Sequence, residues 1–390
     1  MKRTARTRLG LKFITTTGAI ALAVGLAGCA SGSTAPAGDG GSGEAADDLT
    51  VGVAMPTETS ERWINDGQAV KSQLEEAGYG VDLQYANDDI PTQQQQIEQM
   101  VTKGADILII ASIDGTALAS QLEAAAAKGI PVIAYDRLIN GTENVDFYVT
   151  FDNYEVGVQQ ATSLLQALGY MDAEGKDTGL KDKKIIELFA GSPDDNNTAF
   201  FFNGAMDTLK PFLEDGRLTV GSGQTSMDQV ATLRWDGATA QKRMEDLLTS
   251  TYGGGSKPLH GVLAPYDGIS RGIITALQNA GYGENIEAGL PIVSGQDAEI
   301  ASVKLINDGV QFATIFKDTR KLATEAVKAA EAYAEGGDPE ANDTETYDNG
   351  VKVVPSYPLE SDIVVADNIQ SLLIDSEYWT AEEVAAGVAE

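Results

Sequence analysis

The stretch ADILIIASIDGTALASQLEAAAAKGIPVIAYDRLI, residues 105–139, alternates between apolar runs and an alanine-rich segment. The runs at 105–111 and 130–135 have the length and composition of buried strands, and 115–128 has the composition of a helix. Apolar strands joined by helices are typical of a parallel sheet that is covered on both faces. The stretch therefore predicts an α/β fold built from strand–helix–strand units.

The same alternation extends along the chain in both directions. Before this stretch, strands are expected at 49–55 and 79–86, with a helix at 61–77 and another that opens at Pro91. The pattern restarts after about residue 152, which favours two doubly wound lobes of similar size over one large sheet. The later expected helices are 153–168, 197–214, 237–250, 268–280, 298–308 and 318–336, and the later expected strands are 184–190, 218–223, 260–265, 290–295, 312–316, 351–357 and 361–366.

Composition excludes several classes of function. The 390 residues include 58 Asp and Glu but only 27 Lys and Arg, and a net charge of −31 opposes binding to nucleic acid. One Cys and one His are too few for a disulfide framework, a Cys/His zinc site or a Ser-His-Asp triad. His260 stands at the start of an expected strand, where a packing role is favoured. We therefore expect neither a metal nor a cofactor, and no catalytic residue.

The N-terminal segment resembles a bacterial lipoprotein signal. Five basic residues in 1–12 precede a short apolar stretch, 13–28, which ends in the sequence LAGC at Cys29. Residues 30–48 are rich in Gly, Ser, Ala and acids without apolar periodicity, which is typical of a flexible tether. The expectation is a signal peptide at 1–28, lipidation at Cys29, a tether over 29–48, and anchoring to the outer face of the cell membrane.

Polar side chains follow nearly every expected strand. In open parallel sheets, ligands bind beyond the carboxyl ends of the strands. The pair Asp136–Arg137 directly follows a buried strand, and from its sequence alone it fits either an ion pair that fixes a turn or part of a ligand site. The strand-end residues as a set combine carboxylates, amides, cations and Trp. These groups suit the hydroxyls and the apolar C–H faces of a sugar.

The motifs resemble those of bacterial type I periplasmic monosaccharide-binding proteins of the ribose/galactose/xylose class, and within it the multiple-sugar-binding proteins. The similarity covers nearly everything from residue 50 to about 360. The matching motifs are VGVAMPT, RWINDG, DLQYANDDIPTQQQQIEQMVTKG, IASIDGT, VIAYDRLI, TFDNYEVGV, GSPDDNN, TLRWDGATAQ, PYDGIS, VSGQDAE and TIFKDTR.

This resemblance implies a type I periplasmic-binding-protein fold, with two Rossmann-like lobes joined by a three-stranded hinge. The N-terminal lobe would hold 49–151 plus about 318–351, and the C-terminal lobe 152–317 plus about 352–390, with crossings near 151–152, 317–318 and 350–353. Tyr266 stands where many relatives carry Asn, so either Tyr266 or Asp267 would face the ligand. The implied sugar-binding residues are Arg62, Trp63, Asp136, Arg137, Asn196, Trp235, Asp267, Gln296, Asp297 and Lys317.

The implied function is that of a lipid-anchored, monomeric solute-binding protein of an ABC sugar importer. It would bind a monosaccharide of the xylose, glucose, galactose or arabinose type by hinge closure and present it to the permease. One alternative is a glycoside-active enzyme that uses two of the carboxylates. Another is a sugar receptor that feeds a membrane sensor kinase. A sugar-responsive repressor is disfavoured, because an acidic tether stands where a basic DNA-binding helix would be needed. The acidic loop 338–348 is expected to be solvated, since its spacing does not match the EF-hand pattern.

Overall fold

The computed structural model describes residues 49–389. The expected signal peptide, the lipidation site Cys29 and the whole expected tether lie outside the described residues. Within 49–389, no helix has both the length and the apolar character needed to cross a membrane.

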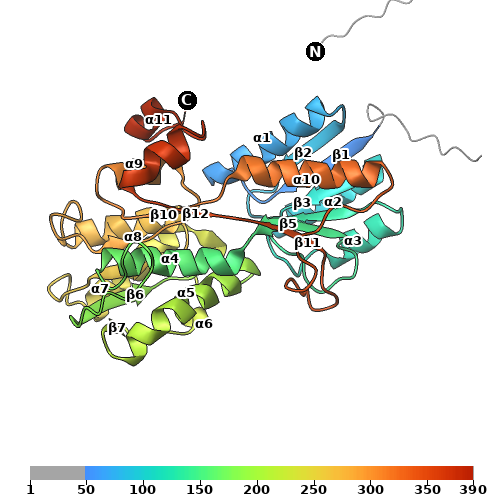
Figure 1. The fold of residues 1–390 in the computed structure, drawn as a ribbon. Coiled ribbons are helices and arrows are strands. Elements are labelled where there is room, and N and C mark those ends of the chain that lie inside the picture. The colour runs from blue at the N-terminus through green and yellow to red at the C-terminus, as the bar shows by residue number, and fades with distance from the viewer. Residues whose placement is uncertain (1–48, 390) are drawn as a thin grey trace, which may run out of the picture. The chain divides into compact units, whose positions relative to one another are not determined.

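The first lobe is built around a six-stranded sheet in the order β11-β5-β4-β3-β1-β2, in which all neighbouring strands are parallel (Figure 1). The central strands are buried along their whole length, as expected for a sheet covered on both faces. The strands are β1 Thr50–Met55, β2 Gly80–Tyr85, β3 Ile107–Ile110, β4 Val132–Tyr135, β5 Phe147–Phe151 and β11 Ser356–Leu359.

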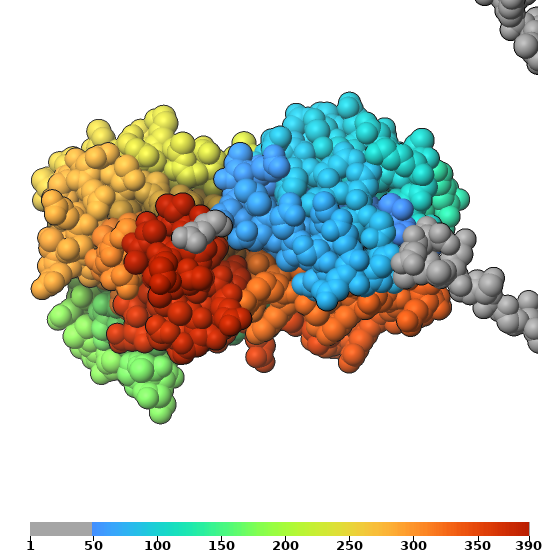
Figure 2. Space-filling model, turned by 90° about the horizontal axis from the view of Figure 1, so that it is seen from above, coloured from blue at the N-terminus to red at the C-terminus, as the bar shows by residue number. Residues whose placement is uncertain are grey.

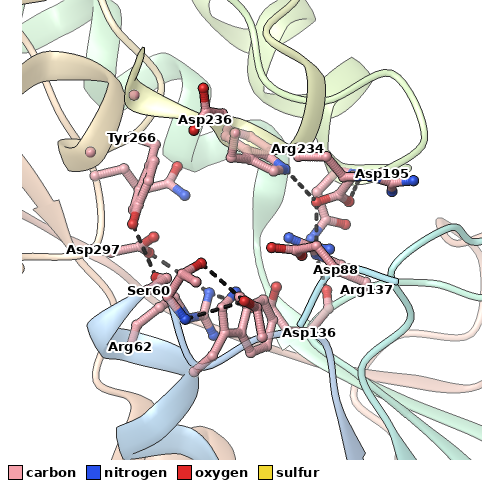
Figure 3. Close-up of a pocket in the computed structure, with 18 of the residues that line it drawn as sticks. Ser60, Arg62, Asp88, Asp136, Arg137, Asp195, Arg234, Asp236, Tyr266 and Asp297 are labelled. Atoms are coloured by element: carbon pink, nitrogen blue, oxygen red, sulfur yellow. Dashed lines mark hydrogen bonds and ion pairs between the residues drawn. The ribbon is translucent and has the colours of Figure 1, made fainter. Parts of the chain in front are cut away.

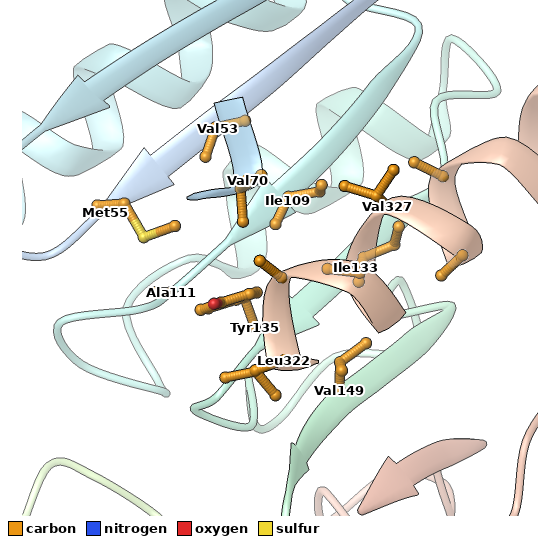
Figure 4. Packing of buried hydrophobic residues seen from close by; sticks show 14 of the residues in the cluster. Val53, Met55, Val70, Ile109, Ala111, Ile133, Tyr135, Val149, Leu322 and Val327 are labelled. Atoms are coloured by element: carbon orange, nitrogen blue, oxygen red, sulfur yellow. The ribbon is translucent and has the colours of Figure 1, made fainter. Parts of the chain in front are cut away.

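Helices cover both faces of this sheet. α1 (Glu61–Glu76) and α10 (Thr319–Ala334) lie side by side on one face, and α2 (Ile90–Lys103) and α3 (Ala119–Ala126) lie on the other. Figure 4 shows the core under α1 and α10, where Val70 and Leu322 pack against strand residues such as Ile109. This core holds the carboxyl ends of β1, β3 and β4 in place, and those ends carry the first lobe's polar residues.

The second lobe has a four-stranded parallel sheet in the order β7-β6-β8-β9. α4 and α5 pack against one face, while α7 and α8 pack against the other. The strands are β6 Lys184–Leu188, β7 Leu218–Val220, β8 Gly261–Leu263 and β9 Ile292–Val293. The helices are α4 Asn153–Ala167, α5 Asn197–Glu214, α6 Met227–Val230, α7 Gly237–Ser250, α8 Asp267–Asn279 and α9 Ile300–Asn307, with a 3₁₀ turn at Leu233–Trp235.

The C-terminal segment packs on α9 and not on either large sheet. β12 (Asp362–Val364) pairs antiparallel with β10 (Thr314–Phe316), and α11 (Ala381–Ala386) contacts α9. Trp379 is buried in this cluster and donates from its indole nitrogen to the Ala298 carbonyl at 2.9 Å. In Figure 2 this segment, drawn in red, lies at the surface beside orange segments of the second lobe.

The chain passes between the lobes three times. Two passages run from β5 into α4 and from β10 into α10. The third follows Leu359 and not 350–353, because β11 pairs with β5 and so belongs to the first sheet. β5 was not among the expected strands, and the alanine-rich helix begins later than the expected 115, because 114–118 forms a turn before α3.

Candidate ligand site between the lobes

A cavity of about 340 Å³ lies between the two lobes, at the carboxyl ends of their strands. Charged, amide and aromatic side chains from both lobes face one another across it, as Figure 3 shows. Its lining residues are Thr57, Thr59, Ser60, Arg62, Trp63, Asp88, Asp136, Arg137, Asp195, Asn197, Phe201, Arg234, Trp235, Asp236, Gly237, Tyr266, Gly268, Arg271, Gln296, Asp297 and Lys317.

Most of the expected site residues line this cavity, but two do not. Arg62, Trp63, Asp136, Arg137, Trp235, Gln296, Asp297 and Lys317 are among the lining residues. Asn196 is not, because it occupies the N-cap of α5, and its neighbours Asp195 and Asn197 face the cavity instead. Asp267 is also absent from the lining, whereas Tyr266 is part of it.

The carboxylate of Asp267 is used inside the second lobe. It accepts hydrogen bonds from the side chains of Gln311 at 2.9 Å and Thr314 at 3.0 Å, and from the Glu299 amide at 3.0 Å. Burial raises the pKa of this carboxyl group well above its ordinary value. Asp267 therefore stabilises the turn that carries Gln296 and Asp297. Of the two neighbours Tyr266 and Asp267, it is Tyr266 that lines the cavity.

The cavity floor carries a buried network of opposite charges. Arg62 reaches Asp136 at 3.0 Å and is oriented from behind by Asp66, which accepts from its Nε at 2.8 Å. Lys317, beside the second interlobe passage, lies 2.9 Å from Asp297. All five side chains are less than a tenth exposed. Charged groups that are paired in this way offer strong hydrogen bonds to a polar ligand.

Asp136 is held in an unusual backbone conformation. Its φ of 60° lies in the left-handed region, which costs a non-glycine residue about 1–2 kcal/mol. Burial alone would raise the pKa of its carboxyl group, but Arg62 and Lys317 outweigh burial and lower the pKa below its ordinary value. Asp136 is therefore an ionised acceptor, held at the end of β4 by the surrounding structure.

Arg137 and Asp195 connect the two lobes. The Nε of Arg137 lies 3.0 Å from the Asp195 carboxylate, which also accepts from the Trp235 indole at 3.2 Å. Burial raises the pKa of Asp195, and the nearby Arg137 acts against that rise. A second contact between the lobes runs through Ser60, whose hydroxyl lies 3.0 Å from the Tyr266 hydroxyl. The lobes are thus joined beside the cavity by an ion pair at one place and by a hydrogen bond at another.

Two adjacent residues with left-handed backbone angles place Trp235 in the cavity. Arg234 has a φ of 58° and Trp235 a φ of 56°. The Trp235 ring lies so close to Gly191 that a Cβ there would stand 2.0 Å from a ring carbon. The absence of a side chain at Gly191 is therefore what allows the indole to lie against the backbone after β6.

Comparison with known proteins identifies the fold family. The model of the periplasmic binding protein domain matches residues 51–338. The chain belongs to this family.

Two relatives and one solved structure are similar to the chain over most of its length. The multiple sugar-binding periplasmic protein SbpA of Azospirillum brasilense is 54% identical over 86% of this chain and 91% of its own length. The multiple sugar-binding periplasmic receptor ChvE of Rhizobium radiobacter is 53% identical over 87% and 93%. A crystal structure of an ABC transporter solute-binding protein from Clostridium phytofermentans with bound β-D-glucose is 45% identical, with a TM-score of 0.80, over 86% of this chain and 99% of the other.

The interlobe cavity is also lined by residues that were not among the expected sugar-binding residues. Asp195, Asn197 and Arg234 stand within strand-end motifs already singled out, so the signal was present but the side chain facing inward was not known. Asp88 and Asp236 also stand within quoted motifs, whereas Arg271 lies just beyond the motif PYDGIS. Arg271 lies a full turn into α8, and its guanidinium pairs with Glu299 at 2.5 Å.

His260 forms a hydrogen bond with the backbone of the neighbouring strand. Its Nδ1 accepts a hydrogen bond from the Ile185 amide at 2.9 Å, which links the start of β8 to β6. Over residues 49–389, no cluster of three or more His, Cys, Asp or Glu side chains is placed to hold a metal ion.

Proposed function

We propose that this chain is the extracytoplasmic receptor of an ABC sugar importer and that it binds one monosaccharide in the interlobe cavity. The observation that carries the proposal is a cavity lined by paired charges, amides and two Trp residues from both lobes of a periplasmic binding protein. SbpA and ChvE are multiple sugar-binding periplasmic proteins, and the related crystal structure contains bound β-D-glucose. Because the family and these relatives are binding proteins, the chain is a receptor and not a glycoside-active enzyme.

The charges around the cavity favour an uncharged ligand. Its cationic lining residues are Arg62, Arg137, Arg234, Arg271 and Lys317, and its acidic ones are Asp88, Asp136, Asp195, Asp236 and Asp297. Equal numbers of the two signs leave no excess charge for an ionic ligand to neutralise. Sugar hydroxyls both donate and accept, so they can bond to either sign without adding charge.

The proposed mechanism is hinge closure about the three interlobe passages. On this proposal the first lobe comprises 49–151 plus 318–359, and the second comprises 152–317 plus 360–389. A sugar held by Asp136, Arg137 and Lys317 would draw the lobes together and so complete the Arg137–Asp195 contact. The monomeric closed form would then dock on the permease, with a lipid on Cys29 keeping it at the membrane surface.

The size of a monosaccharide sets the expected affinity. A ligand of about a dozen heavy atoms that is enclosed between the lobes reaches roughly micromolar affinity.

Isothermal titration of the purified protein with a panel of pentoses, hexoses and hexuronic acids tests this proposal. We expect saturable binding of at least one neutral aldose and weaker binding of its uronic acid. Mass spectrometry of the bound sugar should recover it unchanged. No heat with any aldose would overturn the proposal, and turnover of a nitrophenyl glycoside would favour the enzyme instead.

A further inference from the structure

The main-chain carbonyl of Asp136 is the centre of a buried polar cluster. It lies 2.7 Å from the Tyr148 hydroxyl and accepts from the Thr150 hydroxyl at 3.1 Å. It also accepts from the side-chain amide of Asn197 at 2.8 Å. Asn153 completes the cluster by donating to Thr150 at 3.0 Å and to Asn197 at 3.1 Å. These four side chains, Tyr148, Thr150, Asn153 and Asn197, are called the carbonyl cluster below.

The carbonyl cluster spans the first passage between the lobes. Tyr148 and Thr150 belong to β5 of the first lobe, whereas Asn153 begins α4 and Asn197 begins α5 of the second. All four residues are at most 1% exposed. Only Asn197 is among the residues that line the cavity. The other three must therefore influence a ligand indirectly.

Within the cluster, Asn197 is bound at both ends of its side-chain amide. Its nitrogen donates to the Asp136 carbonyl, and its oxygen accepts from Asn153 and lies 3.0 Å from the Tyr148 hydroxyl. Burial raises the pKa of Tyr148 well above its ordinary value, so its hydroxyl stays neutral and keeps its proton. The cluster thus joins the two lobes through neutral hydrogen bonds, next to the charged floor of the cavity.

We propose that the carbonyl cluster is a positioning device, which aims the Asp136 carboxylate at the ligand and is completed only when the lobes close. The inference rests on the proposed sugar-binding function and adds positioning residues to it. The dependence on closure follows from Asn197, which reaches the first lobe's carbonyl from the second lobe.

The left-handed backbone of Asp136 explains why its carbonyl matters. The backbone angles that direct the carbonyl also direct the Cα–Cβ bond, so fixing the carbonyl fixes the direction in which the side chain leaves the backbone. At a φ of 60° these angles are not the intrinsic preference of an aspartate, and surrounding contacts must maintain them. Losing one hydroxyl of the cluster would remove one of the three donors that hold this carbonyl and let the peptide shift. A displacement well under an ångström is enough to weaken a pre-organised site.

Two buried tyrosines provide a matched test. Tyr148 and Tyr170 are both fully buried, and the Tyr170 hydroxyl also bonds main-chain carbonyls, those of Asp182 and Arg217, but within the second lobe. We expect Tyr148→Phe to weaken sugar binding by about tenfold. The loss should appear mainly as faster dissociation in stopped-flow tryptophan fluorescence. Tyr170→Phe should lower the melting temperature of the sugar-free protein while leaving sugar affinity unchanged.

Thr150→Val is a second variant, because it removes one hydroxyl from a side chain of nearly the same shape. Thr150→Val should also lower sugar affinity, again through faster dissociation. It takes the place of Tyr148→Phe as the test if that variant does not fold. The inference would be overturned if the folded cluster variants bound and released sugar like the wild-type protein. It would also be overturned if Tyr170→Phe lost as much affinity as they do. Absence of sugar binding by the wild-type protein would instead overturn the proposed function, and the inference with it.

Discussion

Arg137 of the first lobe and Asp195 of the second lobe form an ion pair of 3.0 Å across the cavity, and both side chains are at most a tenth exposed. The same carboxylate accepts a hydrogen bond from the Trp235 indole nitrogen. It also caps the start of α5 by accepting from the main-chain amide of Asn197 at 2.9 Å. One carboxylate therefore joins the lobes, orients an aromatic ring and fixes a helix N-terminus. The resemblance implied Asn196 as the sugar-binding residue of this motif, whereas Asp195 is the one that lines the cavity.

We expect Asp195→Asn to weaken sugar binding by about tenfold or more, mostly through faster dissociation. Asparagine keeps the shape and one acceptor for the helix cap. Its amide, however, would face two donors, the Arg137 guanidinium and the Trp235 indole. Asp177→Asn is the control, because Asp177 pairs with Arg217 at 2.7 Å inside the second lobe. Titration calorimetry on both variants measures the effect, and equal affinities would show that the Arg137–Asp195 pair does not support closure.

The packing of Trp235 on Gly191 gives a second prediction. A Cβ at Gly191 would approach carbons of the Trp235 ring to between 2.0 and 2.4 Å, so the indole must move out of its place. We expect Gly191→Ala to shift the tryptophan emission spectrum and to lower sugar affinity by about tenfold or more. The backbone of Gly191 is not left-handed, so the effect would come from the ring and not from backbone strain.

Gly337→Ala is the matched control for this change. A Cβ at Gly337 meets its nearest atom, the Ala332 carbonyl oxygen, at an ordinary 3.6 Å. The control should keep both the emission spectrum and the affinity of the wild-type protein. If Gly191→Ala behaves like Gly337→Ala, Trp235 does not need its observed position to bind sugar.

Much of the fold followed from the sequence because the relevant signals are local. The pattern of apolar residues predicted α5 and α7 with the observed bounds, 197–214 and 237–250. The pairing of β11 with β5 could not be predicted from such local signals. It joins residues about two hundred positions apart, and its strand contains Pro358, which weakens the strand signal.

The site was predictable to within one residue at several positions, and the error has a physical cause. Asn196 and Asn197 are adjacent, as are Tyr266 and Asp267, and each pair stands where a strand gives way to a helix. Which member faces the cavity depends on local backbone angles at this turn, such as the extended φ of −163° at Tyr266. Residue type does not fix those angles. Arg271 came to the cavity from a helix interior, where the rule for strand ends does not apply.

The support behind Arg62 leads to a prediction about pH. Asp66 is fully buried and accepts from Arg62 and, at 2.5 Å, from the Tyr135 hydroxyl. Burial raises the pKa of Asp66 to about 6, above its ordinary value of 3.8. Between these two values the folded chain keeps a proton that the unfolded chain has lost. The contribution of Asp66 to the free energy of unfolding is therefore complete below about pH 4 and is lost as the pH rises through 6.

Asp66→Asn should remove this dependence, because asparagine does not titrate. We expect the difference in unfolding free energy between variant and wild type to move in favour of the variant between pH 4 and 6, by up to about 3 kcal/mol. Urea unfolding across this range measures it. Asp114→Asn is the control, since Asp114 bonds only within an exposed turn of the first lobe, through Thr116. A constant difference between Asp66→Asn and wild type would mean that Asp66 is already ionised at pH 4, with Arg62 outweighing the effect of burial.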